Sequence, residues 1–179
     1  MLKIEELPKL RMRPTECCRW ASVSLIILKD SDEVLLIKRA KNDRDPWSGN
    51  VAFPGGHYEA SDKDLYETAV RETFEEVGIR LYYEDFVGVL DAGSPSNSEN
   101  TKVLPHVFLV AGRLNVRVNP NEVLYAFWLP LREKHHIVPY TFGNIYNGWA
   151  IEYKGEIIWG LTYRIIRELL KKANIAELP

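Results

Sequence analysis

The sequence lacks a long apolar run and an N-terminal targeting segment. Its longest strongly apolar stretch, residues 23–28, is far shorter than the ~20 residues that a membrane-spanning helix needs. Residues 1–9 mix charges throughout and contain no apolar segment followed by a cleavage site of small residues. We therefore expect a cytoplasmic protein that does not associate with membranes.

Cysteine is scarce, and neither sign of charge dominates. The two cysteines, Cys17 and Cys18, are adjacent, and an ordinary disulfide between neighbours is strained. We favour free thiols in a reducing compartment over metal binding or redox chemistry at this pair. The formal net charge is −2, so no overall basic field attracts nucleic acid or an anionic membrane.

The chain also lacks internal repeats, low-complexity tracts and linkers. With 179 residues, of which 46% are hydrophobic and 27% charged, it fits one globular domain with a core of its own. Residues 1–18 form a charged, proline-interrupted lead-in, and we place the domain at residues 19–175.

Alternating apolar and polar residues predict a β-hairpin at 21–38, with its turn at 29–32. A short strand is expected at 51–53 and further strands at 80–90, 103–111, 123–129 and 147–159. A terminal amphipathic helix is indicated by Leu161, Ile165, Ile166, Leu169 and Leu170. The order of elements predicts a mixed α/β domain with few helices.

A second helix is expected from about Asp62 to Val77. Ser61 or Asp62 would cap its free N–H groups, and Gly78 would supply the left-handed residue that ends it. Residues at helical spacing would face the core, namely Tyr66, Val70, Phe74 and Val77.

Three glutamates fall on one face of this helix. Glu72, Glu75 and Glu76 occupy positions i, i+3 and i+4, so their carboxylates lie within about one turn. Such closely placed like charges stabilise nothing unless a cation lies among them, and oxygen-only ligands suit Mg²⁺ or Mn²⁺. The alternative is a solvated acidic face, which spacing alone would favour.

The residues upstream of the helix favour a metal site over a solvated acidic face. A glycine-rich turn, Phe53-Pro-Gly-Gly56, ends a strand just upstream, and glycine lets backbone groups approach a ligand closely. Residues 55–79 resemble the Nudix box, G-x5-E-x7-R-E-U-x-E-E-x-G-U, in which U is a bulky aliphatic residue. Matching residues are Arg71, Glu72, Glu75, Glu76, Gly78 and Ile79.

Two positions depart from the box. Thr73 occupies the first U position. The loop is one residue longer than the plain pattern, so Lys63 stands where the isolated glutamate is expected, and Asp62 beside it is our candidate for that role.

An upstream segment, 35–56, resembles the signature of coenzyme A pyrophosphatases, L-L-T-x-R-[SA]-x3-R-x3-G-x3-F-P-G-G. The longer loop with Glu59 and Asp62, and residues 159–162, also resemble this branch. The match is incomplete, because Ile37 replaces threonine and the spacing from Arg44 to Gly49 is one residue too long. Matching residues are Arg39, Ala40, Arg44, Gly49 and Phe53.

The resemblance implies an α/β/α sandwich with a mixed β-sheet and a site for Mg²⁺ or Mn²⁺. Glu72, Glu75, Glu76 and the carbonyl of Gly55 would hold the ions, and Arg71 would orient the glutamates. Many family members add a downstream glutamate as base or extra ligand; Glu99 and Glu122 are candidates, and Glu122 is favoured because Asn-Pro-x-Glu-Val resembles the family's later segment.

Substrate contacts are expected upstream of the box. Arg39 and Arg44 would bind phosphates, since guanidinium suits bidentate phosphate contacts; solvated charges are the alternative. Phe53, Gly55 and Gly56 would line the site. Trp47 and Tyr58 could stack on a base.

The function implied is hydrolysis of a pyrophosphate bond in a small-molecule nucleotide substrate, with coenzyme A or its derivatives preferred. Dinucleoside polyphosphates, nucleotide sugars and oxidised nucleoside triphosphates would suit the same catalytic groups. Two further alternatives are a nucleotide-sensing module without catalysis and an isopentenyl diphosphate isomerase, which needs a cysteine near its active site. Homodimerisation is expected only by analogy with the family.

Overall fold

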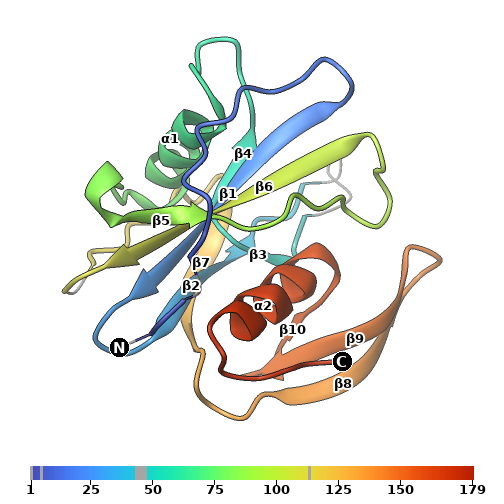
Figure 1. Ribbon diagram of the computed structural model, residues 1–179. Coiled ribbons are helices and arrows are strands. Elements are labelled where there is room, and N and C mark those ends of the chain that lie inside the picture. Colours follow the sequence, from blue (N-terminus) through green and yellow to red (C-terminus); the bar gives the residue numbers. More distant parts are fainter. Residues whose placement is uncertain (1, 5, 43–47, 113) are drawn as a thin grey trace.

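A mixed β-sheet of seven strands forms the centre of the computed structural model, which describes all residues except 1, 5, 43–47 and 113 (Figure 1). Strand order is β3-β2-β1-β6-β5, with β4 paired to β1 and β7 paired to β2. Strands β1 and β6 run parallel along their whole length, and the other described pairs are antiparallel. The bounds are β1 Arg19–Leu28, β2 Glu33–Arg39, β3 Val51–Ala52, β4 Gly55–His57, β5 Phe86–Val89, β6 Thr101–Val110 and β7 Val123–Pro130.

A second, antiparallel sheet of three strands lies beside the C-terminal helix (Figure 1). It consists of β8 (His136–Phe142), β9 (Tyr146–Tyr153) and β10 (Glu156–Ile158), and the helix is α2 (Gly160–Lys172). Trp159, the residue that precedes α2, is surrounded by three aromatic rings. The ring centroids of Tyr140 and Phe142 on β8 and of Tyr146 on β9 lie 4.8–5.7 Å from that of Trp159. This aromatic cluster fixes the N-terminal end of α2.

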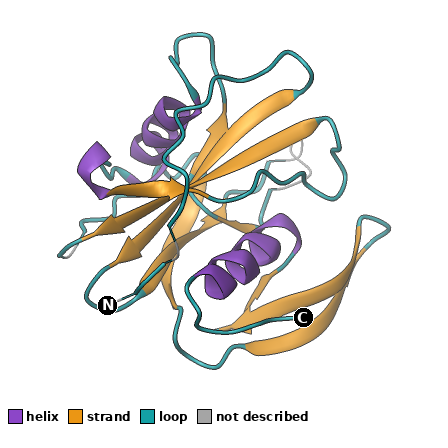
Figure 2. Cartoon of the chain, viewed as in Figure 1, coloured by secondary structure: helices purple, strands orange, loops and turns teal. Residues whose placement is uncertain are grey.

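The central sheet separates two apolar clusters because its strands alternate between faces. On β1, Leu25 and Ile27 pack with α2, whereas Ile26 packs with α1 (Leu65–Val77). The helices consequently cover opposite faces (Figure 2). The expected α/β/α sandwich with a mixed sheet is confirmed, as is the hairpin at 21–38.

Helix α1 begins three residues later than expected. Its N-cap is Asp64, whose side chain accepts a hydrogen bond from the backbone of Glu67, rather than Ser61 or Asp62. The side chain of Asp62 is unavailable as a cap because it binds other partners, described below. Gly78 ends the helix as expected, with φ of 69° in the left-handed region.

The expected core face of α1 is partly wrong. Tyr66 and Val77 are buried, but Phe74 is 46% exposed, with the Arg80 guanidinium over its ring. Small or polar residues occupy the buried face instead, including Ala69 and Thr73. Hydrophobic periodicity could not reveal this, because α1 packs closely against serines of β1.

Several strand predictions need correction. Residues 83–85 form a 3-10 helix, so the strand expected at 80–90 shortens to β5. The run at 147–159 is a hairpin of two strands that turns at Lys154-Gly155, where Lys154 also has a positive φ. Strands β4 and β8 were not predicted, because β4 is glycine-rich and a proline, Pro139, interrupts the apolar residues of β8.

Both chain ends pack onto the domain. Leu2 and Leu7 of the lead-in are buried in the cluster that contains α2. At the other end, the Tyr163 hydroxyl donates a hydrogen bond to the Pro179 carbonyl. None of the helices in the described part of the chain is long and apolar enough to cross a membrane.

His106 of β6 is a fully buried titratable group. Its Nδ1 lies 3.2 Å from the Leu104 carbonyl, its Nε2 has no hydrogen-bond partner in the described structure, and the Tyr66 and Phe86 rings surround it. Burial lowers the pKa of His106 to about 4. The folded protein therefore keeps this imidazole neutral at pH values where an unfolded chain would protonate it.

This burial predicts acid sensitivity. Between the ordinary histidine pKa of about 6.5 and the folded value of about 4, the unfolded state binds the extra proton, so the free energy of unfolding falls as pH decreases. From pH 7 to pH 4.5, wild type should lose about 2 kcal/mol more than His106→Gln, measured by urea unfolding. The exposed His136, changed to Gln, is the matched control and should behave as wild type. Equal losses in wild type and His106→Gln would contradict the prediction.

Candidate active site

The glycine turn and the glutamate face of α1 meet because both pack on β1. Gly55 pairs with Val23 of β1 in β4, and α1 covers β1 and β4. A Cβ on Gly56 would lie only 2.4–2.6 Å from the carboxylate atoms of Glu72, and one on Gly55 would lie 2.1 Å from the Ser22 carbonyl oxygen. Only glycine permits both approaches.

Glu76 is the most deeply buried of the three box glutamates, with 8% of its surface exposed. The Gly55 N–H donates to its Oε2 at 2.8 Å. Burial, together with the negative charges of Glu72 and Glu122, raises the pKa of Glu76 to about 8, although the Gly55 N–H and Arg39 oppose the rise. The carboxylate form of Glu76 would therefore gain strongly from a nearby cation.

Glu72 and Glu75 share one partner. Arg71 Nη1 lies 2.9 Å from Glu72 Oε1 and 3.4 Å from Glu75 Oε2. Burial raises the pKa of Glu72 even though Arg71 opposes the shift, whereas Glu75 is more exposed. Arg71 thus contacts two of the three box glutamates.

Arg71 is itself held by Asp62. Its Nε and Nη2 donate to the two carboxylate oxygens of Asp62 at 2.9 Å each, and Nη2 also donates to the His57 carbonyl at 3.0 Å. Thr68 Oγ1 and the Glu59 N–H donate to the same carboxylate. Burial opposes ionisation, but these hydrogen bonds, with Arg71 foremost, hold the pKa of Asp62 below its usual range. Asp62 therefore contacts the box arginine from its loop position.

Thr73, which departs from the box, has a buried polar partner. Its Oγ1 donates to Ser24 Oγ at 2.8 Å, and Ser24 Oγ donates to the Ala69 carbonyl. Since β1 presents serines to α1, a hydroxyl at position 73 is satisfied where a bulky aliphatic side chain would leave Ser24 with fewer partners. No pattern in the sequence indicates this pairing.

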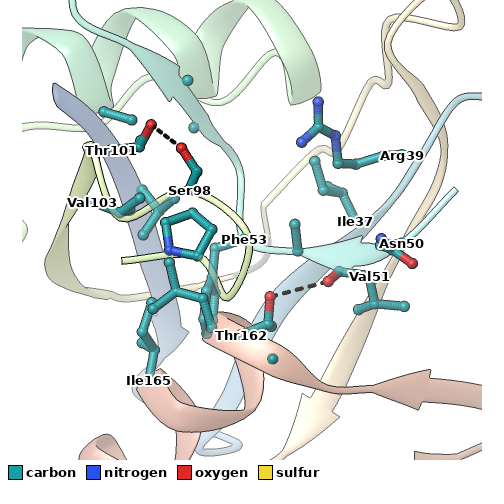
Figure 3. Close-up of a pocket in the computed structure, with 18 of the residues that line it drawn as sticks. Ile37, Arg39, Asn50, Val51, Phe53, Ser98, Thr101, Val103, Thr162 and Ile165 are labelled. Carbon is teal, nitrogen blue, oxygen red and sulfur yellow. Dashed lines mark hydrogen bonds between the residues drawn. The ribbon is translucent and has the colours of Figure 1, made fainter. Parts of the chain in front are cut away.

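A cleft of about 210 Å³ opens beside Glu76 and the glycine turn (Figure 3). It lies between the sheet and the start of α2, and the loop before β6 forms another wall. The predicted residues Arg39, Phe53, Gly55 and Gly56 line it with Glu76, whereas Arg71, Glu72 and Glu75 do not. Asn50 and Ser98 line the cleft although their positions in the sequence did not predict it, and residues 159–162 had no predicted role. Other lining residues include Thr101, Val103, Trp159, Leu161, Thr162 and Ile165.

The two downstream acids differ in position. Glu122 precedes β7, next to the end of β2, where its backbone carbonyl accepts from Ala40. Its charge raises the pKa of both Glu72 and Glu76. Glu99 is exposed in the loop before β6 and does not line the cleft. The structure thus brings Glu122, rather than Glu99, close to the box glutamates.

Other predicted residues lie elsewhere. Arg44 and Trp47 fall outside the described residues. Tyr58 is half-buried against the cluster that contains α1, away from the cleft lining. Cys17 and Cys18 are free, with Sγ atoms 3.4 Å apart, and neither lines the cleft.

The donor chemistry of the box fits a hard divalent ion, but the side chains are not gathered around one point. No three His, Cys, Asp or Glu side chains in the described ranges converge closely enough to hold a metal. Glu72 and Glu75 are bonded to Arg71 and Glu76 to the Gly55 N–H. Burial nevertheless raises the pKa of Glu72 and Glu76, which a cation would relieve. Metal binding would therefore require these carboxylates to exchange hydrogen bonds for the ion.

The Arg71–Asp62 pair predicts a large loss of stability for Asp62→Asn. The amide would point an NH₂ group at donors that now share a carboxylate, so the free energy of unfolding should fall by about 3 kcal/mol. Urea unfolding at neutral pH measures the loss. Glu59→Gln is the control, because Glu59 is exposed and 3.9 Å from Arg71, and it should cost less than about 0.5 kcal/mol. Similar losses in the two variants would show that Asp62 does not hold Arg71.

Comparisons with known proteins identify the family. The family model described as NUDIX domain matches residues 19–142. The uncharacterized Nudix hydrolase NudL of Yersinia enterocolitica is 35% identical over 162 residues, covering 87% of this chain and 82% of that protein. The NudL protein of Photorhabdus laumondii is 34% identical over 178 residues, covering 95% and 93% of the two chains.

Solved structures share the fold at low sequence identity. A MutT/nudix family protein from Enterococcus faecalis superposes with a TM-score of 0.66 at 16% identity, covering 91% of this chain and 64% of that one. The NUDIX domain of Shewanella oneidensis NrtR, solved with ADP ribose, has a TM-score of 0.52 at 17% identity, covering 65% and 75%. Together with the family match and the curated relatives, the geometry of the box shows that this chain belongs to the Nudix family and is a Nudix hydrolase of pyrophosphate bonds.

Proposed function

We propose that this Nudix hydrolase cleaves the pyrophosphate bond of coenzyme A or a coenzyme A derivative. The observation that carries the proposal is the position of buried Glu76, at the point where the glycine turn and the cleft meet. The preference for coenzyme A rests on the segment 35–56, of which Arg39 and Phe53 line that cleft.

Glu72, Glu75, Glu76 and the carbonyl of Gly55 are the groups that would hold Mg²⁺ or Mn²⁺. Bound divalent ions neutralise the charge of a diphosphate and lower the pKa of a water molecule that attacks phosphorus. The raised pKa values of Glu72 and Glu76 support this assignment, because both carboxyls lie where a positive charge is missing.

The remaining groups orient the glutamates, accept a proton or contact a substrate phosphate. Arg71 orients Glu72 and Glu75 through Nη1, while Asp62 prevents the guanidinium from turning away. We assign Glu122, which lies beside the box glutamates, as the base that accepts a proton from the attacking water. Arg39, at the cleft, would contact a substrate phosphate. Arg44 is assigned the same role from the sequence alone.

The alternatives differ in what they require. Dinucleoside polyphosphates, nucleotide sugars and oxidised nucleoside triphosphates would use the same catalytic groups, so they differ only in the group that the cleft admits. A sensing module would tolerate loss of box carboxylates, yet all three are retained here. An isomerase would need a cysteine at the site, and neither cysteine lines the cleft.

Replacing the exposed Glu75 or the buried Glu76 of the box with glutamine tests the chemistry. Glu75→Gln and Glu76→Gln should each lower metal-dependent kcat by about 100-fold or more, because each loses a charged ligand while keeping its shape. Product release with Mg²⁺ and with Mn²⁺ is the measurement. Glu67→Gln, on the same helix but bonded to Lys63 and Arg11, is the control and should retain activity. Wild-type turnover in both box variants would refute the assignment.

A substrate panel tests the specificity. With Mg²⁺, coenzyme A should give a higher kcat/KM than ADP-ribose or diadenosine polyphosphates, and mass spectrometry should identify adenosine 3′,5′-bisphosphate and 4′-phosphopantetheine as products. Faster turnover of any other compound in the panel would replace coenzyme A as the proposed substrate without affecting the pyrophosphatase chemistry.

A further inference from the structure

The cleft continues past the catalytic end into a largely apolar interior. Arg39 stands at one end of the cleft and Ile165 of α2 at the other, with Phe53 and Val103 on the walls between them (Figure 3). Glu76 and the glycine turn also line the cleft, and Glu76 lies close enough to Arg39 for their charges to interact. A diphosphate held at Glu76 would therefore direct one of its two substituents into this interior. Which substituent enters depends on what the walls can bind.

Most hydroxyl groups on these walls already have protein partners. Thr162 Oγ1 donates to the Val51 carbonyl at 3.1 Å, which ties the start of α2 to β3. Ser98 Oγ and Thr101 Oγ1 are 2.8 Å apart and bond to each other. The cleft thus offers few free polar groups to a ligand.

Asn50 is the exception. Its Nδ2 is a buried side-chain donor with no hydrogen-bond partner in the described structure, and among the four atoms of that kind it alone belongs to a cleft residue. Leaving a buried amide donor unpaired is unfavourable, because the donor has lost its hydrogen bond to water without gaining another. A ligand carbonyl or other neutral acceptor would relieve that cost.

Cationic groups are equally few. Arg39 is the only lysine or arginine among the described residues that line the cleft, and it stands at the end occupied by Glu76. Phosphates buried in the interior would lose hydration without a compensating charge, which is strongly unfavourable. The nucleoside bisphosphate half of coenzyme A does not suit this interior, whereas the neutral pantetheine chain, with its methyl groups and amide carbonyls, does.

We propose that the pantetheine half of the substrate, free or acylated, enters the cleft between α2 and the sheet, that the adenosine bisphosphate half remains outside, and that Asn50 selects the chain by donating to one of its carbonyls. This inference rests on the proposed function, since it assigns the two halves of coenzyme A to places around the same site.

Calorimetric binding of the two hydrolysis products, with Mg²⁺ present, separates the halves. Asn50→Ala should weaken binding of 4′-phosphopantetheine about five- to tenfold, the loss of one neutral hydrogen bond, and leave adenosine 3′,5′-bisphosphate within about twofold. Leu161→Trp, which narrows the cleft at a half-buried position, should weaken binding of 4′-phosphopantetheine by about tenfold or more. It too should leave binding of adenosine 3′,5′-bisphosphate within about twofold.

Asn97→Ala is the matched control, because Asn97 is exposed and does not line the cleft, and it should change neither affinity. Thermal unfolding confirms that each variant is folded; should Asn50→Ala fail to fold, Leu161→Trp still decides. Unchanged phosphopantetheine affinity in the folded variants, or a selective loss of bisphosphate binding, overturns the inference. Hydrolysis of coenzyme A by wild type reports on the proposed function alone, so each proposal fails by a different measurement.

Discussion

The paired hydrogen bonds between Arg71 and Asp62 join two parts of the chain on which the whole site depends. Asp62 belongs to the loop after the glycine turn, and Arg71 belongs to α1, so the pair fixes the loop against the helix. The same guanidinium then holds Glu72 and Glu75. Three anionic groups around one arginine leave a negative excess, which Glu76 and Glu122 increase. The site is consequently stable only with hydrogen bonds that anchor each carboxylate, and it is arranged to gain from added positive charge.

Burying these carboxylates lowers the free energy of unfolding, and the apolar core around the site offsets that loss. Glu76 is buried with a single backbone donor, and its raised pKa records how poorly the anion is solvated there. The surrounding core is made of branched aliphatic side chains on β1 and β2 that alternate between the two faces of the sheet. Because these strands are buried on both faces, they supply a rigid base that does not depend on the site. Poor solvation at Glu76 is therefore tolerated locally, as is common where function and stability compete.

The sequence predicted the elements whose signals are local. The spacing of Glu72, Glu75 and Glu76 placed them on one helical face, and Gly78 marked the end of that helix. It failed where tertiary contacts decide: Phe74 has the spacing of a core residue but faces solvent, because β1 presents Ser24 to Thr73. The N-cap moved from Asp62 to Asp64 since Arg71 competes for the Asp62 carboxylate. Asn50 could not be identified at all, because its lack of a partner exists only once β3 and α2 form the cleft.

The cleft and the box come from different parts of the topology, and this separates chemistry from selection. The box is continuous in sequence, from Gly55 to Ile79. The cleft is assembled from segments far apart: the parallel pairing of β1 with β6 brings the loop at 94–100 beside the glycine turn, and the aromatic cluster around Trp159 sets the start of α2 across from it. Substitutions in the loop or in α2 can reshape the cleft without moving Glu72 or Glu76. The same reacting groups can thus serve different diphosphates on one fold, and the identity of the substrate must be sought in the walls of the cleft rather than in the box.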